Sequence, residues 1–278
     1  MKNLVANPKT LPIRFKLGND CYVGMPSGVK TEKADGKIIY TATVGTLEVK
    51  AVCVAYEDFD ASEWTVYFTN TGAEPSPRLS EVSVIDCLFE GENNRVITCN
   101  GDYYSADGYA PAETRLACGA EIKLVPRGGR SCDGAFPYQR ILFDGKGVNL
   151  AVGWPGQWKC AFHGTDEGVR YTAGQEVLDS VVLPGETLRT PLIVVVSFDG
   201  DPETGVNVWR RFYRKYVGIA KPHLQGSYSG GGLEFTHATE ENQLAAIERA
   251  KKNGIDINLW WLDAGWYKIG AGGVTFEK

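Results

Sequence analysis

The stretch LWWLDAGWYKIG, residues 259–270, places one carboxylate beside several large aromatic rings. Asp263 follows a nearly continuous apolar run, and Trp266 comes directly after Gly265. A pyranose ring offers an apolar face on which an aromatic ring can stack, and its hydroxyl groups donate hydrogen bonds to a carboxylate. Asp263 and Trp266 are therefore the candidate substrate-binding residues, and sugar binding is the expected chemistry. The alternative is that Asp263 is a turn or helix-capping residue and that the rings belong to a core.

The elements that must position these two residues lie in 233–278, which has the pattern of the start of a parallel α/β structure. LEFTHA at 233–238 is a strand candidate, 239–253 predicts a helix, and IDINLWWLD at 255–263 predicts a second strand. In a parallel βαβ arrangement the ligand-binding end is the C-terminal end of each strand. Asp263 stands at that end. The predicted buried side of the helix consists of Leu244, Ala246, Ile247 and Ala250.

The side of the second strand that faces the ligand stays open. If Asp263 faces the axis of a barrel, alternation puts Ile257, Leu259 and Trp261 on the same side. Asn258 then faces the helix layer, which is an unfavourable place for an amide. The sequence does not decide between the two orientations.

Most of the chain, 1–220, has a different pattern, made of short β-rich runs interrupted by Gly, Asn and Asp. About ten strands without intervening helices favour antiparallel sheets packed on one another. The fold class is therefore mainly β: a large antiparallel β-supersandwich followed by the first βαβ elements of a truncated (β/α)8 TIM barrel. The predicted hairpins and strands are 37–58, turning at Gly45, 140–154, turning at Asp144–Gly147, 64–68, 81–89, 95–99, 121–125, 169–172, 177–183 and 192–198.

Residues 205–217 predict a helix at the end of the sandwich. Trp209, Phe212, Tyr213 and Tyr216 recur at helical spacing with basic residues between them, so one apolar stripe is expected to lie against the sheets. The following segment, 221–232, has no periodicity and ends in three glycines, which is typical of a linker.

Composition narrows the class of protein. The chain has 278 residues, with 29 Lys and Arg against 34 Asp and Glu, so it offers no basic surface for nucleic acid. It contains no apolar run of about 20 residues that would span a membrane, and its first residues do not have the apolar region of a signal peptide. We expect a cytoplasmic protein without nucleic-acid or membrane partners.

The cysteines and histidines predict neither a disulfide framework nor a metal site. The seven cysteines are scattered and odd in number, and we interpret them as reduced core thiols. The three histidines, His163, His223 and His237, have no paired spacing, so no metal and no cofactor are expected.

Several segments in a fixed order resemble glycoside hydrolase family 36, the α-galactosidases, and related clan members. They are INLWWLDAGWY with its flanks, GGRSCDGAFPYQRILFDGKGVNLAVGWPGQW at 128–158, and LPGETLRTPLIVVVSFDGD at 183–201. The resemblance implies an N-terminal β-supersandwich followed by a catalytic (β/α)8 barrel. It also implies that Trp154 and Trp158 belong to the sandwich, where we expect packing or interface roles.

The family's DDGW signature matches the chain at 263–266. The resemblance implies that Asp263 hydrogen-bonds galactose hydroxyls and that Trp266 forms a wall of the sugar subsite. The second carboxylate of the signature is Ala264 here, a departure that removes one hydroxyl acceptor and weakens the assignment to galactose. A retaining glycosidase needs two carboxylates about 5–5.5 Å apart. In the family these lie on later barrel strands, so no catalytic residue is expected in this chain and the pair is expected downstream of Lys278.

The leading hypothesis is therefore the N-terminal part of a retaining glycoside hydrolase that hydrolyses terminal α-galactosides when complete, with a small oligosaccharide as its partner. A complete barrel takes about 250 residues, far more than 233–278 supplies. The first alternative is a non-catalytic carbohydrate-binding or interaction β-sandwich module, and the second is a clan α-glycosidase of another sugar specificity. Apolar faces left without neighbours in 233–278 are expected to cause aggregation or a homo-oligomer.

Overall fold

The computed structural model of the chain describes residues 3–101, 106–218, 226–228, 238–255, 257 and 259–262. It divides into two compact units, Met1–Tyr213 and Arg214–Lys278, which are described separately. The boundary falls inside the predicted helix 205–217. The division predicted from the sequence, with a sandwich up to residue 220 and a linker at 221–232, stays a prediction.

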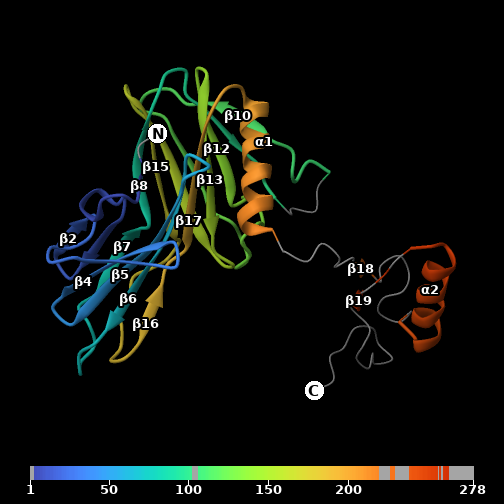
Figure 1. The fold of residues 1–278 in the computed structure, drawn as a ribbon, viewed down its shortest axis with the longest axis horizontal. Helices are drawn as coiled ribbons and strands as arrows, with labels where there is room; N and C mark the ends of the chain where they lie inside the picture. Colours follow the sequence, from blue (N-terminus) through green and yellow to red (C-terminus); the bar gives the residue numbers. More distant parts are fainter. Residues whose placement is uncertain are drawn as a thin grey trace. The chain divides into compact units, whose positions relative to one another are not determined.

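The first unit contains a large, wholly antiparallel sheet that runs through most of its length (Figure 1). Its strand order is β10-β9-β12-β13-β17-β6-β5-β4-β3, and β16 also pairs with β6. The strands are β3 (Lys30–Ala34), β4 (Lys37–Val44), β5 (Leu47–Tyr56), β6 (Ala61–Asn70), β9 (Arg95–Thr98), β10 (Ala112–Arg115), β12 (Tyr138–Phe143), β13 (Lys146–Gly153), β16 (Thr187–Arg189) and β17 (Leu192–Asp199).

Two smaller antiparallel sheets accompany it. One has the order β2-β1-β7, and the other has the order β11-β14-β15-β8. Their strands are β1 (Arg14–Leu17), β2 (Asp20–Val23), β7 (Leu79–Ser83), β8 (Ile85–Glu90), β11 (Glu121–Leu124), β14 (Trp158–Gly164) and β15 (Gly168–Gln175). A short 3-10 helix, Pro8–Thr10, precedes them. The expectation of a mainly β, sandwich-like fold is confirmed.

The core lies between the sheets, and in β5 and β14 it follows the two-residue period of the strand. In β5 the burial pattern alternates strictly over most of the strand, and Val49, Ala51 and Cys53 face inward. Trp64 and Trp158 are the largest fully buried side chains, each with 0% exposure. Each indole is also hydrogen-bonded, Trp64 to the Val84 carbonyl at 2.7 Å and Trp158 to the Ser131 carbonyl at 2.8 Å. Polar ring atoms are thus satisfied inside the core, as burial requires.

Both predicted hairpins form, and their turns fall at the expected places. Val44 pairs with Leu47 around Gly45, which has a φ of 58°. Phe143 pairs with Lys146 around Gly145, which has a φ of 69°. Both φ values lie in the left-handed region that glycine adopts without a Cβ penalty, which explains why the turns were recognisable from the sequence.

The strand prediction was wrong at two places. Val177–Leu183 is not a strand: only Ser180 makes an isolated bridge, to Leu79, and Val177 is 82% exposed. Its apolar residues do not alternate between two faces of a ladder, so composition alone was misleading. The predicted strand 81–89 is two strands, β7 and β8, which belong to different sheets. Strands β1, β2, β3, β10, β14 and β16 were not predicted.

The predicted helix at the end of the sandwich is present and begins three residues earlier than expected. Helix α1 spans Pro202–Phe212 and continues as a π-helical turn, Tyr213–Val217. The Asp201 carboxylate caps it by accepting a hydrogen bond from the Thr204 amide, and Pro202 occupies the first turn, where its missing N–H has no cost. The helix lies along the large sheet over β13 and β17 (Figure 1).

A second hydrophobic cluster fills the space beneath α1. Phe212 is fully buried there and packs with Val194, Val196, Ala61 and Ala151 of the sheet. The apolar stripe is only partly covered, because Tyr213 and Tyr216 are each 39% exposed. The half of the stripe formed by Trp209 and Phe212 therefore holds the helix on the sheet.

In the second unit, helix α2 spans Glu240–Lys252 and confirms the predicted helix 239–253. Thr239 and Asn242 form a reciprocal capping box. The buried side differs from the prediction at Leu244, which is 54% exposed, whereas Gln243 is 8% exposed. Gln243 turns inward because its side-chain carbonyl accepts a hydrogen bond from the indole N–H of Trp260 at 2.9 Å.

The second unit also holds a parallel strand pair, β18 (Gly226–Tyr228) and β19 (Leu259–Trp261). Strand β19 lies within the predicted strand 255–263. Strand β18 falls inside the segment that we expected to be a linker, and the predicted strand at 233–238 lies mostly outside the described residues. Two parallel strands and one helix in the order β18-α2-β19 agree with a βαβ element, while a barrel stays a prediction.

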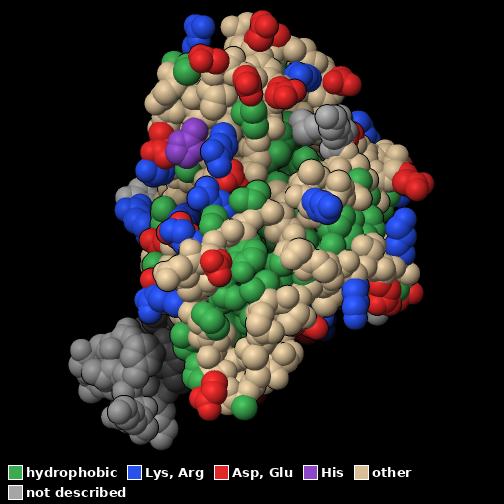
Figure 2. All heavy atoms as spheres, turned by 90° about the vertical axis from the view of Figure 1, so that its left-hand side faces the viewer, with side chains coloured by type: hydrophobic (Ala, Val, Ile, Leu, Met, Phe, Trp, Pro, Cys, Tyr) green, Lys and Arg blue, Asp and Glu red, His purple; other side chains and the backbone are tan. Residues whose placement is uncertain are grey.

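Surface charge is mixed in sign. Figure 2 shows Lys and Arg side chains interspersed with Asp and Glu side chains around hydrophobic side chains on one face of the molecule. Within the described part of the chain, no group of three or more His, Cys, Asp and Glu side chains is arranged to hold a metal ion. None of the helices that the structure describes is long and apolar enough to cross a membrane.

Candidate functional site

Asp263 and Trp266, the predicted sugar-binding residues, lie outside the described residues, and so does Ala264. Strand β19 ends at Trp261, two residues before Asp263. Their arrangement at the end of the strand stays a prediction.

The side chains of β19 distinguish between the two strand orientations left open by the sequence. Trp260 is partly buried and bonds to Gln243 of α2, so it lies on the helix side. Leu259 and Trp261 are 41% and 60% exposed, so they occupy the opposite face. This alternation favours the orientation in which odd-numbered positions of the strand face away from the helix.

Two of the hollows of ligand size in the first unit are lined by strands of the large sheet. The larger, which we call the aromatic groove, has a volume of about 550 Å³ and runs between α1 and strands β9, β12 and β13 of the large sheet. The smaller, which we call the end pocket, has a volume of about 500 Å³ and lies where β8 of the four-stranded sheet approaches β13 and β17. Binding pockets for small molecules typically measure about 300–1,000 Å³.

The walls of the aromatic groove include a run of rings in edge-to-face or tilted contact. Tyr109 contacts Phe136 with ring centroids 5.5 Å apart, and Phe136 contacts Tyr138 at 5.1 Å. Tyr138 contacts Trp209 of α1 at 5.6 Å. Tyr109 is 61% exposed and Tyr138 is 37% exposed, so these rings present surface to a ligand.

A polar network lies at the floor of this groove and joins the sheet to the helix. The Arg140 Nε donates a hydrogen bond to the Asn149 side-chain oxygen at 2.6 Å, and the Asn149 amide donates to the Gly205 carbonyl of α1 at 3.0 Å. Burial lowers the pKa of the Arg140 guanidinium below its usual value. Because the chain Arg140–Asn149–Gly205 ties both walls together, the groove is a preformed feature of the fold.

Tyr138 is the titratable ring of the groove with the most strongly perturbed environment. Burial raises the pKa of its hydroxyl to about 12, and a hydrogen bond with Tyr213 adds to the rise. The Tyr138 hydroxyl therefore stays neutral at physiological pH, and it serves the groove as a hydrogen-bonding group.

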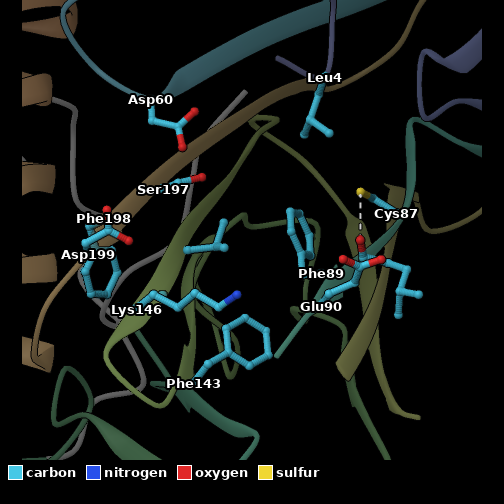
Figure 3. A pocket seen from close by; sticks show the side chains of 13 residues that line it. Leu4, Asp60, Cys87, Phe89, Glu90, Phe143, Lys146, Ser197, Phe198 and Asp199 are labelled. Carbon is cyan, nitrogen blue, oxygen red and sulfur yellow. Dashed lines mark hydrogen bonds between the residues drawn. The ribbon is translucent and has the colours of Figure 1, made fainter. Parts of the chain in front are cut away.

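Charged side chains surround the end pocket (Figure 3). Asp60 and Lys146 point into the hollow from opposite sides, and Glu90 and Asp199 line it as well. All four of these charged residues are exposed. The sheet arrangement brings Asp60 and Glu90 into one hollow, and both remain exposed there.

The aromatic rings of the end pocket are inaccessible, unlike those of the groove. Phe89 is 1% exposed and Phe143 is 3% exposed, because both belong to the core between the sheets. The end pocket therefore offers exposed charges above buried rings.

The two tryptophans of GWPGQW have the packing roles expected of them. Trp158 is wholly buried on β14, and Trp154 is partly buried and packs against the core. The expectation that all seven cysteines are core thiols was wrong for two of them. All seven are free, but Cys21 and Cys118 are exposed, and only Cys53 and Cys160 are fully buried.

The first unit is thus a large antiparallel β-sandwich with a helix on the outer face of its main sheet. No protein-family profile matches the sequence, and no curated protein matches it. The structure is similar to solved glycoside hydrolase family 36 (GH36) α-galactosidases. The expected resemblance to that family is confirmed at the level of the fold.

Three of these solved structures illustrate the similarity. The α-galactosidase from Lactobacillus brevis superposes with a TM-score of 0.64 and 15% identity, over 94% of this chain and 37% of its own. The GH36 enzyme AgaB from Geobacillus stearothermophilus gives 0.64 and 16%, over 92% and 39%. A variant of AgaA from the same organism, solved with raffinose, gives 0.66 and 18%, over 95% and 41%. The chain therefore spans about 40% of the length of the structures that it matches.

Proposed function

We propose that this chain is the β-sandwich and first barrel segment of a retaining glycoside hydrolase that acts on terminal α-galactosides. The observation that carries the proposal is the similarity of its fold to GH36 α-galactosidases over 92–95% of the chain. Two of the similar structures are complexes with raffinose and with stachyose, which are oligosaccharides. A small oligosaccharide is accordingly the proposed partner.

In this proposal Asp263 and Trp266 form one side of the sugar subsite. The carboxylate accepts hydrogen bonds from sugar hydroxyls, and the indole stacks on the apolar face of the ring. The catalytic pair, a nucleophile and an acid/base about 5–5.5 Å apart, belongs to later strands of the complete barrel. The free thiols support a cytoplasmic location as part of the same proposal.

The test is the hydrolysis of p-nitrophenyl α-galactoside and p-nitrophenyl α-glucoside by the full-length protein. We expect turnover of the galactoside, and a fall of about 100-fold or more in kcat/KM when Asp263→Asn removes the charged hydroxyl acceptor. The matched control is Asp199→Asn, a change at an exposed carboxylate of the end pocket, which should leave kcat/KM within about twofold of wild type.

The outcomes separate the three functions under consideration. If the α-glucoside is hydrolysed faster than the α-galactoside, the protein is a related α-glycosidase with another sugar specificity. Saccharide binding with no hydrolysis of either substrate supports a non-catalytic carbohydrate-binding module and rejects the hydrolase.

A further inference from the structure

We infer that the aromatic groove beneath α1 is a second saccharide site that binds a neutral oligosaccharide, separately from the position of Asp263. The class of ligand rests on the proposed function, but the site is argued from the first unit alone. All residues of the groove belong to Met1–Tyr213.

The rings of the groove suit the apolar faces of sugars. Tyr109 and Tyr138 are exposed by 61% and 37%, and Trp209 supplies a larger ring at the opposite wall. Their edge-to-face and tilted contacts hold the rings in fixed orientations. Fixed aromatic platforms bind flat, weakly polar surfaces at little cost in conformational entropy.

Arg140 supplies hydrogen-bond donors that no group in the described part of the chain uses. Its one hydrogen bond within the described part of the chain engages Nε, and no carboxylate there pairs with it. The terminal nitrogens of the guanidinium remain as donors in a planar fork, a geometry that suits two neighbouring hydroxyl oxygens. Among the described residues, the terminal nitrogens of Arg140 are not buried atoms without a partner, so they are open to a ligand that accepts these hydrogen bonds.

The rim of the groove adds both hydrogen-bond acceptors and hydrogen-bond donors. Glu203, Asn207 and Arg210 line it from α1, and their side chains form no hydrogen bond or ion pair with the described residues. A hydroxyl group both donates and accepts, so a surface that offers a carboxylate, an amide and a guanidinium matches a polyhydroxylated ligand. With charges of both signs present, the groove favours a neutral ligand over a polyanion.

An apolar peptide is the main alternative ligand for the groove, and the guanidinium of Arg140 at its floor disfavours such a peptide. Apolar side chains over Arg140 would shield its guanidinium from water without offering a hydrogen-bond acceptor in return.

The end pocket is a poorer saccharide site, because Phe89 and Phe143 have almost no exposed ring surface there.

The test follows the indole N–H signal of Trp209 by proton–nitrogen NMR while the chain is titrated with raffinose or with maltotriose. We expect a saturable shift of this signal. Two variants should each raise the dissociation constant about tenfold: Tyr109→Ala, which removes an exposed ring, and Arg140→Lys, which keeps the charge but loses the planar fork of donors. The matched control is Tyr67→Ala on β6, a partly exposed tyrosine on the same sheet that lies outside the groove.

The readout distinguishes this site from the one in the proposed function. Asp263→Asn should leave the Trp209 titration unchanged. An inactive full-length enzyme whose Trp209 signal still titrates would overturn the proposed function and leave this inference standing. A Trp209 signal that neither sugar shifts, or affinity in Tyr109→Ala and Arg140→Lys equal to that of Tyr67→Ala, would overturn the inference.

Discussion

The ring of Phe198 lies so close to Gly205 that a Cβ at Gly205 would be 2.4 Å from the Phe198 Cζ atom. Phe198 is the next-to-last residue of β17, and Gly205 belongs to the first half of α1. The same glycine accepts the hydrogen bond from Asn149 that joins the helix to the sheet. The absence of a side chain at Gly205 therefore sets how closely α1 approaches the sheet and, with it, the width of the aromatic groove.

The first prediction concerns Gly205→Ala. Overpacking in a filled site costs about 1–3 kcal/mol, whereas alanine gains up to about 1 kcal/mol over glycine inside a helix. We expect a net loss of about 1–2 kcal/mol in the free energy of unfolding, measured by urea denaturation. The control is the same change in a Phe198→Leu background, where a smaller side chain leaves room for the methyl group. Equal losses in the two backgrounds would show that the ring does not oppose the methyl group.

The second prediction concerns the pH dependence of the cap of α1. Hydrogen bonds from the Thr204 amide and hydroxyl to the Asp201 carboxylate hold its pKa below the ordinary value of 3.8. A carboxyl whose pKa is lowered by folding stabilises the protein at pH values above 3.8, and that contribution is lost as the pH falls through the lowered pKa.

Asp201→Ala should therefore lower the urea midpoint near pH 7, and the difference from wild type should shrink as the pH falls below 3.8 and through the lowered pKa of the carboxyl. Asp201→Asn is the control, because its side-chain oxygen also caps but does not titrate. A difference between wild type and Asp201→Ala that stays constant with pH would assign the effect to something other than the charged cap.

Much of the fold is visible in the sequence because its signals are local. The hairpin at Gly45 combines two-residue alternation with a glycine at positive φ. The hairpin at Gly145 has an Asp–Gly pair whose glycine is at positive φ, and both signals are readable within about ten residues. Strand β14, WKCAFHG, carries the same signal, since Trp158, Cys160 and Phe162 alternate inward, and it was overlooked. The prediction of a strand at Val177–Leu183 was wrong because this segment has the composition of a strand but not its alternation of buried and exposed residues.

The aromatic groove was beyond reach of the sequence. Tyr138 and Arg140 lie two residues apart on β12, but Tyr109 and Trp209 come from other segments. The four residues meet only because β9, β12 and β13 are neighbours in the sheet and α1 returns across them. Sheet order depends on long-range pairing, which a local pattern does not encode. The helical spacing correctly predicts that Trp209 faces the sandwich. Its second role, as part of the groove wall, depends on where the helix lies on the sheet, which the spacing does not indicate.

The third prediction concerns thiol reactivity. Burial raises the pKa of both Cys53 and Cys160 to about 12. Because the thiolate is the reactive form, these two cysteines should resist iodoacetamide in the native protein near pH 8. Cys21, which is exposed, should be modified first. Cys118 is also exposed, but a hydrogen bond with Asp166 raises its pKa, so it should react more slowly than Cys21.

Peptide mass spectrometry after a short labelling pulse measures each site separately. All seven cysteines should be modified in denaturant, which shows that protection comes from the fold. Modification of Cys53 or Cys160 at the rate of Cys21 in the native state would contradict their placement in the core.

The fourth prediction separates packing from sugar binding at the tryptophans of GWPGQW. Trp158→Phe leaves a cavity in a fully buried site and removes the hydrogen bond to the Ser131 carbonyl, so we expect a loss of about 2–4 kcal/mol in the free energy of unfolding. Trp154→Phe is the matched control. Because Trp154 is only partly buried, this substitution should lower the free energy of unfolding by less than about 1.5 kcal/mol. Urea denaturation gives both values, and NMR titration with raffinose gives the affinity. Weaker raffinose binding in Trp158→Phe at unchanged stability would instead make this tryptophan a substrate contact, since a core residue acts on binding only through the stability of the fold.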